Sequence, residues 1–146
     1  MIRYIPMAEW EEQLYKVLTS HIVGYEIFNT VAPLDTEEPI PERWATIGAY
    51  TCAPSSAKAD VANFRVTSTI HAWCKGQNKQ KLNEMLNDIV QSASYGAEAG
   101  EYELEHFVCH SVDFAMVEAF EVDFDSGESG QHGVVRITAD LQQKYI

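Results

Sequence analysis

The most regular pattern of apolar and polar positions runs from residue 64 to residue 93. Side chains alternate in character over residues 64–73, and a period of two among β-prone residues predicts a strand. A turn that contains Gly76 follows, and residues 78–93 then repeat apolar side chains at helical spacing. The apolar stripe of this helix consists of Leu82, Met85, Leu86, Ile89, Val90 and Ala93. Because strand and helix are so close in sequence, we expect the helix to fold back onto a sheet that contains the strand.

The two sides of the predicted strand differ in polarity. One side consists of Phe64, Val66, Ser68, Ile70 and Ala72, and the other of Arg65, Thr67, Thr69, His71 and Trp73. The helix can cover one face of the sheet, so the more polar side is left for solvent or for a contact between subunits. Trp10, Trp44 and Trp73 are expected to fill the core between helices and sheet, with a subunit contact as the alternative for Trp73.

The remaining sequence predicts a second helix and further strands. The expected elements are a helix at residues 8–21, strands at 25–31, 44–51, 102–114, 116–124 and 134–141, loops at 32–43 and 52–63, a helix end at 94–100, and a polar turn at 125–133. The N-terminal helix has an apolar face formed by Trp10, Leu14, Val17, Leu18 and His21. This order predicts one α+β domain with a mostly antiparallel sheet and both helices packed on one face.

The charge distribution is the unusual bulk property of the chain. The net charge is −12 over 146 residues, which disfavours adhesion to free nucleic acid or to an anionic membrane. Residues 82–135 contain twelve acids and no Lys or Arg. This stretch is either a solvated acidic face or a surface that avoids one partner and attracts a basic one. The sequence also lacks a long apolar run and an apolar signal segment, so we expect assembly in the cytoplasm.

Motifs for catalysis or cofactor binding are missing from the sequence. No phosphate-binding glycine loop or GxSxG motif occurs, and the odd set of Cys52, Cys74 and Cys109 suggests reduced thiols. Possible nucleophiles are Cys52, Ser55 and Ser56. The possible zinc ligands are His71, Cys74, His106, Cys109, His110 and His132. We expect no cofactor, no metal and no enzymatic activity, and keep a small acidic metal-binding domain or enzyme that uses His71, His106 and His110 as the alternative.

The order of these features resembles the tail-completion proteins of long-tailed phages, also called tail terminators or head-to-tail joining proteins. The matching segments are an N-terminal helix, GYEIFNTVAPLDTEEPIP, WATIGAY, the polar CAPSSAKADVAN, FRVTSTIHAWCKGQNKQKLNEMLNDI and HGVVRITADL. The resemblance extends from about residue 10 to residue 141 and depends on order and spacing rather than on one motif. The acidic turn at residues 125–132 has no counterpart in the family pattern and is a plain insertion or an additional docking loop.

The resemblance implies a structural virion protein that assembles in the host cytoplasm. In that family a homohexameric ring sits at the head-proximal end of the tail tube, ends tube polymerisation and joins the tail to the head connector. The implied partners are the chain itself, the tail tube protein and the connector or stopper protein, with no membrane. DNA would pass through the bore without specific binding, and a neck or head-completion protein of related fold is the nearest alternative.

Three residue sets follow from combining the resemblance with the charge pattern. An acidic bore would repel passing DNA, so the candidates for lumen-facing residues are Glu98, Glu101, Glu103, Glu105, Glu118, Glu121 and Asp123. Candidates for loops that meet neighbouring rings are Pro33, Leu34, Pro39, Pro41, Arg43, Ser55, Ser56 and Lys58. Candidates for contacts between subunits are Arg65, Thr67, Thr69, His71 and Trp73.

Overall fold

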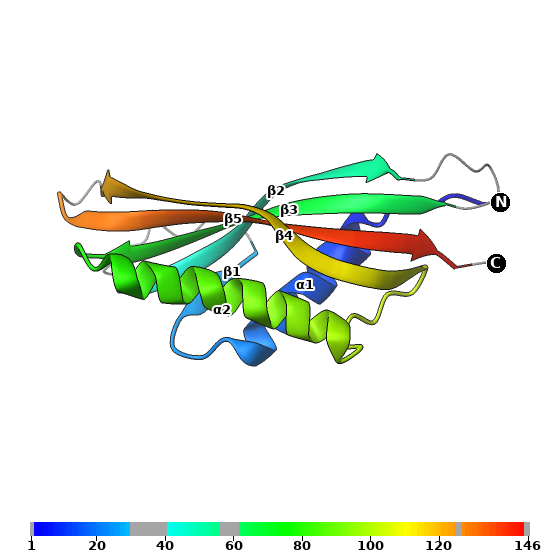
Figure 1. Cartoon of the computed structure of the whole chain (residues 1–146), viewed down its shortest axis with the longest axis horizontal. Helices are drawn as coiled ribbons and strands as arrows, with labels where there is room; N and C mark the ends of the chain where they lie inside the picture. The colour runs from blue at the N-terminus through cyan, green and yellow to red at the C-terminus, as the bar shows by residue number, and fades with distance from the viewer. Residues whose placement is uncertain (1, 30–40, 56–61, 125–126, 145–146) are drawn as a thin grey trace.

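The computed structural model describes residues 2–29, 41–55, 62–124 and 127–144. In this part of the chain two helices lie on one side of a five-stranded sheet whose long strands follow the longest dimension of the molecule (Figure 1). The elements are α1 (Met7–His21), β1 (Glu26–Phe28), β2 (Arg43–Pro54), β3 (Asn63–Lys75), α2 (Lys79–Glu98), β4 (Phe107–Asp123) and β5 (Ser129–Gln143). The predicted α+β fold, with a mostly antiparallel sheet and helices on one face, is confirmed.

The long β3 strand is at the centre of the sheet. The strand order is β1-β2-β3-β5-β4, and every neighbouring pair is antiparallel except the short β1, which runs parallel to β2. A hairpin joins β4 to β5, and its closing bond runs from the Phe124 backbone N–H to the Glu128 carbonyl at 2.8 Å. Consequently β1 lies at one end of the sheet and β4 at the other.

The predicted faces of β3 and α2 form the core. The side of β3 that carries Val66, Ser68 and Ile70 is buried, as are Met85 and Ile89 on α2. These apolar faces meet because the amphipathic helix removes both from water at once. The turn between them uses Gly76 at φ +85°, and the Asn78 side chain accepts a bond from the Lys81 backbone N–H at 3.2 Å, which caps the helix.

The two helices also contact each other closely. The predicted face of α1 is buried through Trp10, Leu14, Val17 and Leu18, whereas His21 is exposed. Near the end of α2, a Cβ atom added to Gly96 would lie only 2.6 Å from Val17 Cγ1. Glycine at this position therefore permits the approach of α1.

The strands β2 and β5 extend further than local composition predicted, whereas α2 ends where expected. The helix ends at Glu98, within the expected range 94–100, and its last turns pack on α1. Residues 52–54, expected in a loop, extend β2, and residues 129–133, expected in a turn, begin β5. Both segments are paired with β3 despite their small and polar side chains, so tertiary pairing overrides local preference.

The expected strands at residues 102–114 and 116–124 are instead one strand, β4, which begins only at Phe107, so the prediction of strand for residues 102–106 is wrong. Register shifts lie between Cys109 and Ser111 and between Phe114 and Met116. Each shift places one extra residue in β4, and this reverses the alternation of its side chains. Apolar and polar residues alternate poorly in this part of the sequence, and the two bulges rather than the end of a strand account for it.

The expectation that the tryptophans lie between helices and sheet is right only for Trp10, and the alternative of a subunit contact for Trp73 stays a prediction. Its ring is fully buried between α1 and the sheet, and its Nε1–H donates to Ser68 Oγ at 2.9 Å. Trp44 and Trp73 are cross-strand partners on the opposite face of the sheet, with ring centroids 5.5 Å apart. The reason is the strand period, because the neighbouring Ala45 and Ala72 occupy the helix-covered face.

Candidate functional site

The acidic residues proposed to line a bore occupy two separate places. Glu98, Glu101, Glu103 and Glu105 lie at the end of α2 and in the segment before β4, while Glu118, Glu121 and Asp123 lie on the last part of β4. The first turn of α2 lies beside Ala119 and Glu121, and the helix runs from there towards the other end of the sheet (Figure 1). The two groups are therefore at opposite ends of the molecule.

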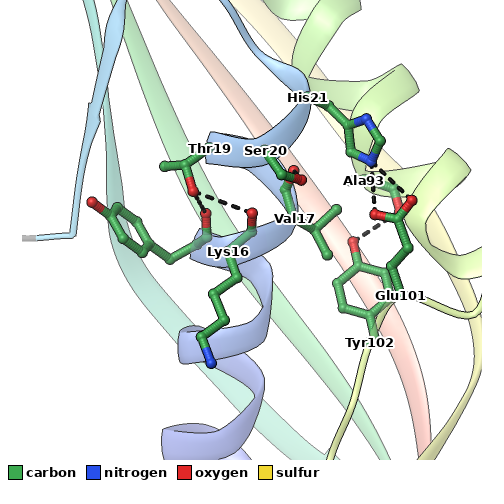
Figure 2. A network of polar contacts seen from close by, with 9 residues as sticks. Lys16, Val17, Thr19, Ser20, His21, Ala93, Glu101 and Tyr102 are labelled. Carbon is green, nitrogen blue, oxygen red and sulfur yellow. Dashed lines mark hydrogen bonds and ion pairs between the residues drawn. The ribbon is translucent and has the colours of Figure 1, made fainter.

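One of these acids is engaged within the chain. Figure 2 shows the His21 ring at the end of α1 pointing at the Glu101 carboxylate, with Nε2 and Oε2 2.7 Å apart. Next to it the Tyr102 hydroxyl donates to the Ala93 carbonyl at 2.8 Å. These contacts fasten the segment after α2 to both helices. Glu103, in contrast, is exposed.

A second histidine–carboxylate pair fixes the start of the chain. The Nδ1 atom of His106 lies 2.9 Å from Glu9 Oε2, and its backbone N–H donates to Glu9 Oε1 at 2.9 Å. Burial alone would raise the pKa of Glu9, but the hydrogen bonds from His106 outweigh it, so the pKa lies below its usual value. Tyr4 stacks on the His106 ring with centroids 3.9 Å apart. No pattern in the sequence predicts this contact between Glu9, His106 and Tyr4.

Most of the expected interface-loop residues fall outside the described residues. This applies to Pro33, Leu34, Pro39, Ser56 and Lys58. Pro41 is exposed, and the Arg43 guanidinium lies over the Tyr25 ring, 5.2 Å from its centroid. Ser55 follows β2, and its backbone N–H donates to the Asn63 carbonyl at 2.9 Å. Arg43 and Ser55 thus mark the two ends of β2.

The proposed subunit-contact residues all lie on the sheet face that the helices leave uncovered. They are Arg65, Thr67, Thr69, His71 and Trp73 of β3. Arg65 is exposed and pairs with its cross-strand partner Asp140, with Nε and Oδ1 3.1 Å apart. Bonds from Arg65 and Ser111 hold the pKa of Asp140 below its usual value, against a smaller effect of burial.

An aromatic row crosses this uncovered face. Trp44, Trp73, His132 and Phe120 are successive cross-strand partners on β2, β3, β5 and β4. Trp73 and His132 stack with centroids 4.6 Å apart and planes 6° apart, and Phe120 meets His132 edge-on at 4.7 Å. Offset and edge-on ring pairs of this kind stabilise a sheet face.

His132 of this row shares a hydrogen bond with His71, which lies outside the row. His71 Nδ1 lies 2.9 Å from His132 Nε2. Burial lowers the pKa of His71, and burial together with His71 lowers the pKa of His132 to about 4. A neutral pair can share one proton between the two ring nitrogens, whereas two imidazolium rings would repel each other.

The six residues considered as possible zinc ligands are distributed over the fold. His71 and His132 bond to each other, His106 bonds to Glu9, and His110 Nε2 lies 2.7 Å from Gln142 Oε1. In the described part of the chain, no three His, Cys, Asp or Glu side chains gather as ligands for one metal ion. The histidines are therefore used in separate pairwise contacts.

Among the candidate nucleophiles, Cys52 has the properties of a structural residue, whereas Ser56 lies outside the described residues. Cys52 is half-buried on β2, and burial raises the pKa of its thiol. Burial likewise raises the pKa of Cys109 to about 11. Both thiols are protonated at neutral pH and therefore poor nucleophiles.

Neither helix in the described residues is long and apolar enough to cross a bilayer.

Sequence reasoning missed the exposed apolar side chains of β4. Four of the nine large apolar side chains that are exposed in the described residues lie on this strand, namely Val108, Phe114, Val117 and Phe120. The missing signal was the strand order, since β4 lies at the end of the sheet and has a neighbouring strand on one side only.

Comparison with known proteins establishes the fold. No family model and no curated protein sequence matches the chain. A solved structure described as "Virion of native gene transfer agent (GTA) particle" contains a chain with a TM-score of 0.75 and 11% sequence identity, covering 97% of this chain and 100% of that one. The two chains share a fold. Since the match spans both chains almost completely, the sheet and both helices are arranged alike.

Proposed function

We propose that this protein is a structural virion protein that forms a homohexameric ring at the head-proximal end of a phage tail. The ring ends polymerisation of the tail tube, joins the tail to the connector under the head and lets DNA pass through its bore. The observation that supports this most is the full-length likeness to a chain of a virion particle. The resemblance of the motif order to tail-completion proteins supports it independently.

The site geometry is compatible with a scaffold rather than a reaction centre. Two of the described histidines pair with carboxylates, His21 with Glu101 and His106 with Glu9, and these pairs join elements of the fold. The thiols of Cys52 and Cys109 are protonated. What remains available at the surface is acidic charge, an uncovered sheet face and the apolar strand β4, and these are features of an assembly component.

Acidic side chains in the proposed bore would allow DNA to pass without binding. Lys and Arg in a DNA channel would bind phosphates, whereas carboxylates repel them and keep the DNA mobile. Glu118, Glu121 and Asp123 are exposed on β4, and Glu98, Glu103 and Glu105 are exposed at the other end of the molecule. We expect at least one of these groups to face the lumen. A ring whose bore is basic and whose carboxylates lie outside would contradict this.

The test is the length of tails assembled with and without the protein, measured by negative-stain imaging. Loss of the protein should give tubes of uncontrolled length, and restoring it should return one defined length. Tails of normal length that fail to join heads would instead favour a neck or head-completion protein. Size-exclusion chromatography with light scattering and zinc analysis provides a second test, since a strict monomer with stoichiometric zinc would support the metal-binding alternative.

A further inference from the structure

The outer edge of β4 is an unusually long open strand edge. β4 has 17 residues and pairs only with β5, and among the described residues no backbone group bonds to its other side. Exposed edges are normally protected by short length, lysine or proline, because free N–H and C=O groups recruit another strand. β4 contains neither Lys, Arg nor Pro. Its length and composition therefore favour pairing with a further strand.

A second open edge lies at the other end of the sheet, on β2. The short β1 pairs only with Trp44–Thr46 of this strand, so residues 47–54 have a neighbour on the β3 side alone within the described residues. No acid occurs in β2, and its one charged residue is Arg43. In contrast, β4 contains four charged residues in addition to its histidine, and all four are acidic: Asp113, Glu118, Glu121 and Asp123.

The exposed side chains at the two edges lie on the same face of the sheet. Tyr50 of β2 is 42% exposed and Phe114 of β4 is 49% exposed. Cross-strand pairing connects them in one row through Ser68 and Ile137, and these two residues are buried on the helix-covered face. A sheet that continued from one molecule into the next would therefore bring apolar groups together on that face.

The directions of the strands fit the same contact. The sequence of antiparallel pairs from β2 through β3 and β5 means that β2 and β4 run in opposite directions. Rotation about an axis that follows the strands preserves these directions. Thus β4 of one copy would meet β2 of the next in an antiparallel pair, and a contact between two different edges repeats around a closed ring.

We infer that the ring is closed by pairing of the β4 edge of one copy with the β2 edge, residues 47–54, of the next copy. This rests on the proposed ring and specifies its interface. The partner is a second copy in head-to-tail contact rather than a two-fold dimer of β4 strands. Pairing β4 with itself would set acid against acid, whereas β2 brings no negative charge.

Cross-linking in assembled particles tests this interface directly. The three native cysteines are replaced by alanine, Ala53→Cys is introduced on β2, and a second cysteine is placed in turn at Ser111, Ala115 or Ala119 of β4. A bismaleimide spanning about 8 Å reaches the adjacent strand over two residues of register in either direction. Within one copy the two edges are three strands apart, about 14 Å, so the reagent joins only different copies.

At least one of the three double-cysteine variants should give cross-linked products from dimer to hexamer. Variants with a single cysteine should give none. Circular dichroism checks that each variant folds. A ring that is visible by imaging but yields no cross-link with any pair would overturn the inference and leave the proposed function intact. Dimers from a single cysteine on β4 would overturn it in favour of the two-fold contact. Particles without a ring of this protein would overturn both.

A charge substitution gives an independent readout. Val117→Lys places an edge-protecting cation on exposed β4, and Val23→Lys, at an exposed position outside the sheet, is the matched control. We expect Val117→Lys to reduce ring assembly by roughly tenfold or more while the control assembles normally. Equal assembly of both variants would contradict the edge contact.

Discussion

Acidification should destabilise this protein through His132. The ring is half-buried against Trp73 and bonded to His71, and its pKa is lowered from 6.5 to about 4. Between these two pKa values the His132 imidazole is therefore protonated in the unfolded chain and neutral in the folded chain. For a group with a lowered folded pKa, the stabilisation is complete above pH 6.5 and is lost as the pH falls towards 4.

The magnitude follows from the two pKa values. Between pH 7.5 and pH 5 a shift from 6.5 to about 4 removes about 2 kcal/mol from the free energy of unfolding. Solvent screens a half-buried ring, so about 1–2 kcal/mol is expected for the His132 contribution. His132→Phe keeps a ring between Trp73 and Phe120 but cannot titrate, and it should remove this part of the pH dependence.

Urea unfolding followed by tryptophan fluorescence at pH 7.5 and pH 5 measures this effect at low micromolar protein. The quantity to compare is the change in unfolding free energy between the two pH values, because other groups also titrate. His110→Gln is the control, since His110 is exposed and its ring forms a hydrogen bond with Gln142 outside the His71–His132 pair. If His132→Phe loses as much stability on acidification as the wild type does, the reasoning about the histidine pair is refuted.

Three further predictions concern the core and its anchors. Ser68→Ala leaves the buried Trp10 Nε1–H without an acceptor, so the free energy of unfolding should fall by about 1–3 kcal/mol in urea titrations. Gly96→Ala should destabilise by about 1–3 kcal/mol despite the higher helix propensity of alanine, because its Cβ meets α1, and a higher thermal midpoint would contradict this. Glu9→Gln should flatten the loss of stability below about pH 4.5, since the lowered pKa of Glu9 stabilises the fold only above that range; an unchanged acid limb would exclude the contact with His106 as its source.

The parts of the fold that sequence predicted are those set by local period. The stripe that begins at Leu82 and the alternation from Val66 to Ala72 each describe one element packed on one face, so both were readable without knowing any partner. The extent of β5 was not readable, because residues 129–133 are glycine-rich and polar and become a strand through pairing with β3 and β4. In β4 the bulges shifted the alternation and concealed one continuous strand.

The candidate surfaces were less predictable because they depend on strand order. His71 and His132 are 61 positions apart in sequence, and only the register of β3 and β5 makes them neighbours. The exposure of Phe114 similarly follows from the position of β4 at the end of the sheet. Composition did identify the acidic stretch, but its division into two separated groups required the course of α2.

The absence of cations from most of α2 and all of β4 determines how these elements can be mapped by proteolysis. Trypsin cleaves after Lys81 and next after Arg136, so the whole intervening stretch is released as one 55-residue peptide. Protection of the β4 edge in an assembled particle would leave no trace in a tryptic digest. A glutamate-specific protease has sites at Glu105, Glu118 and Glu121, before and within β4, and would report directly on whether this strand is covered.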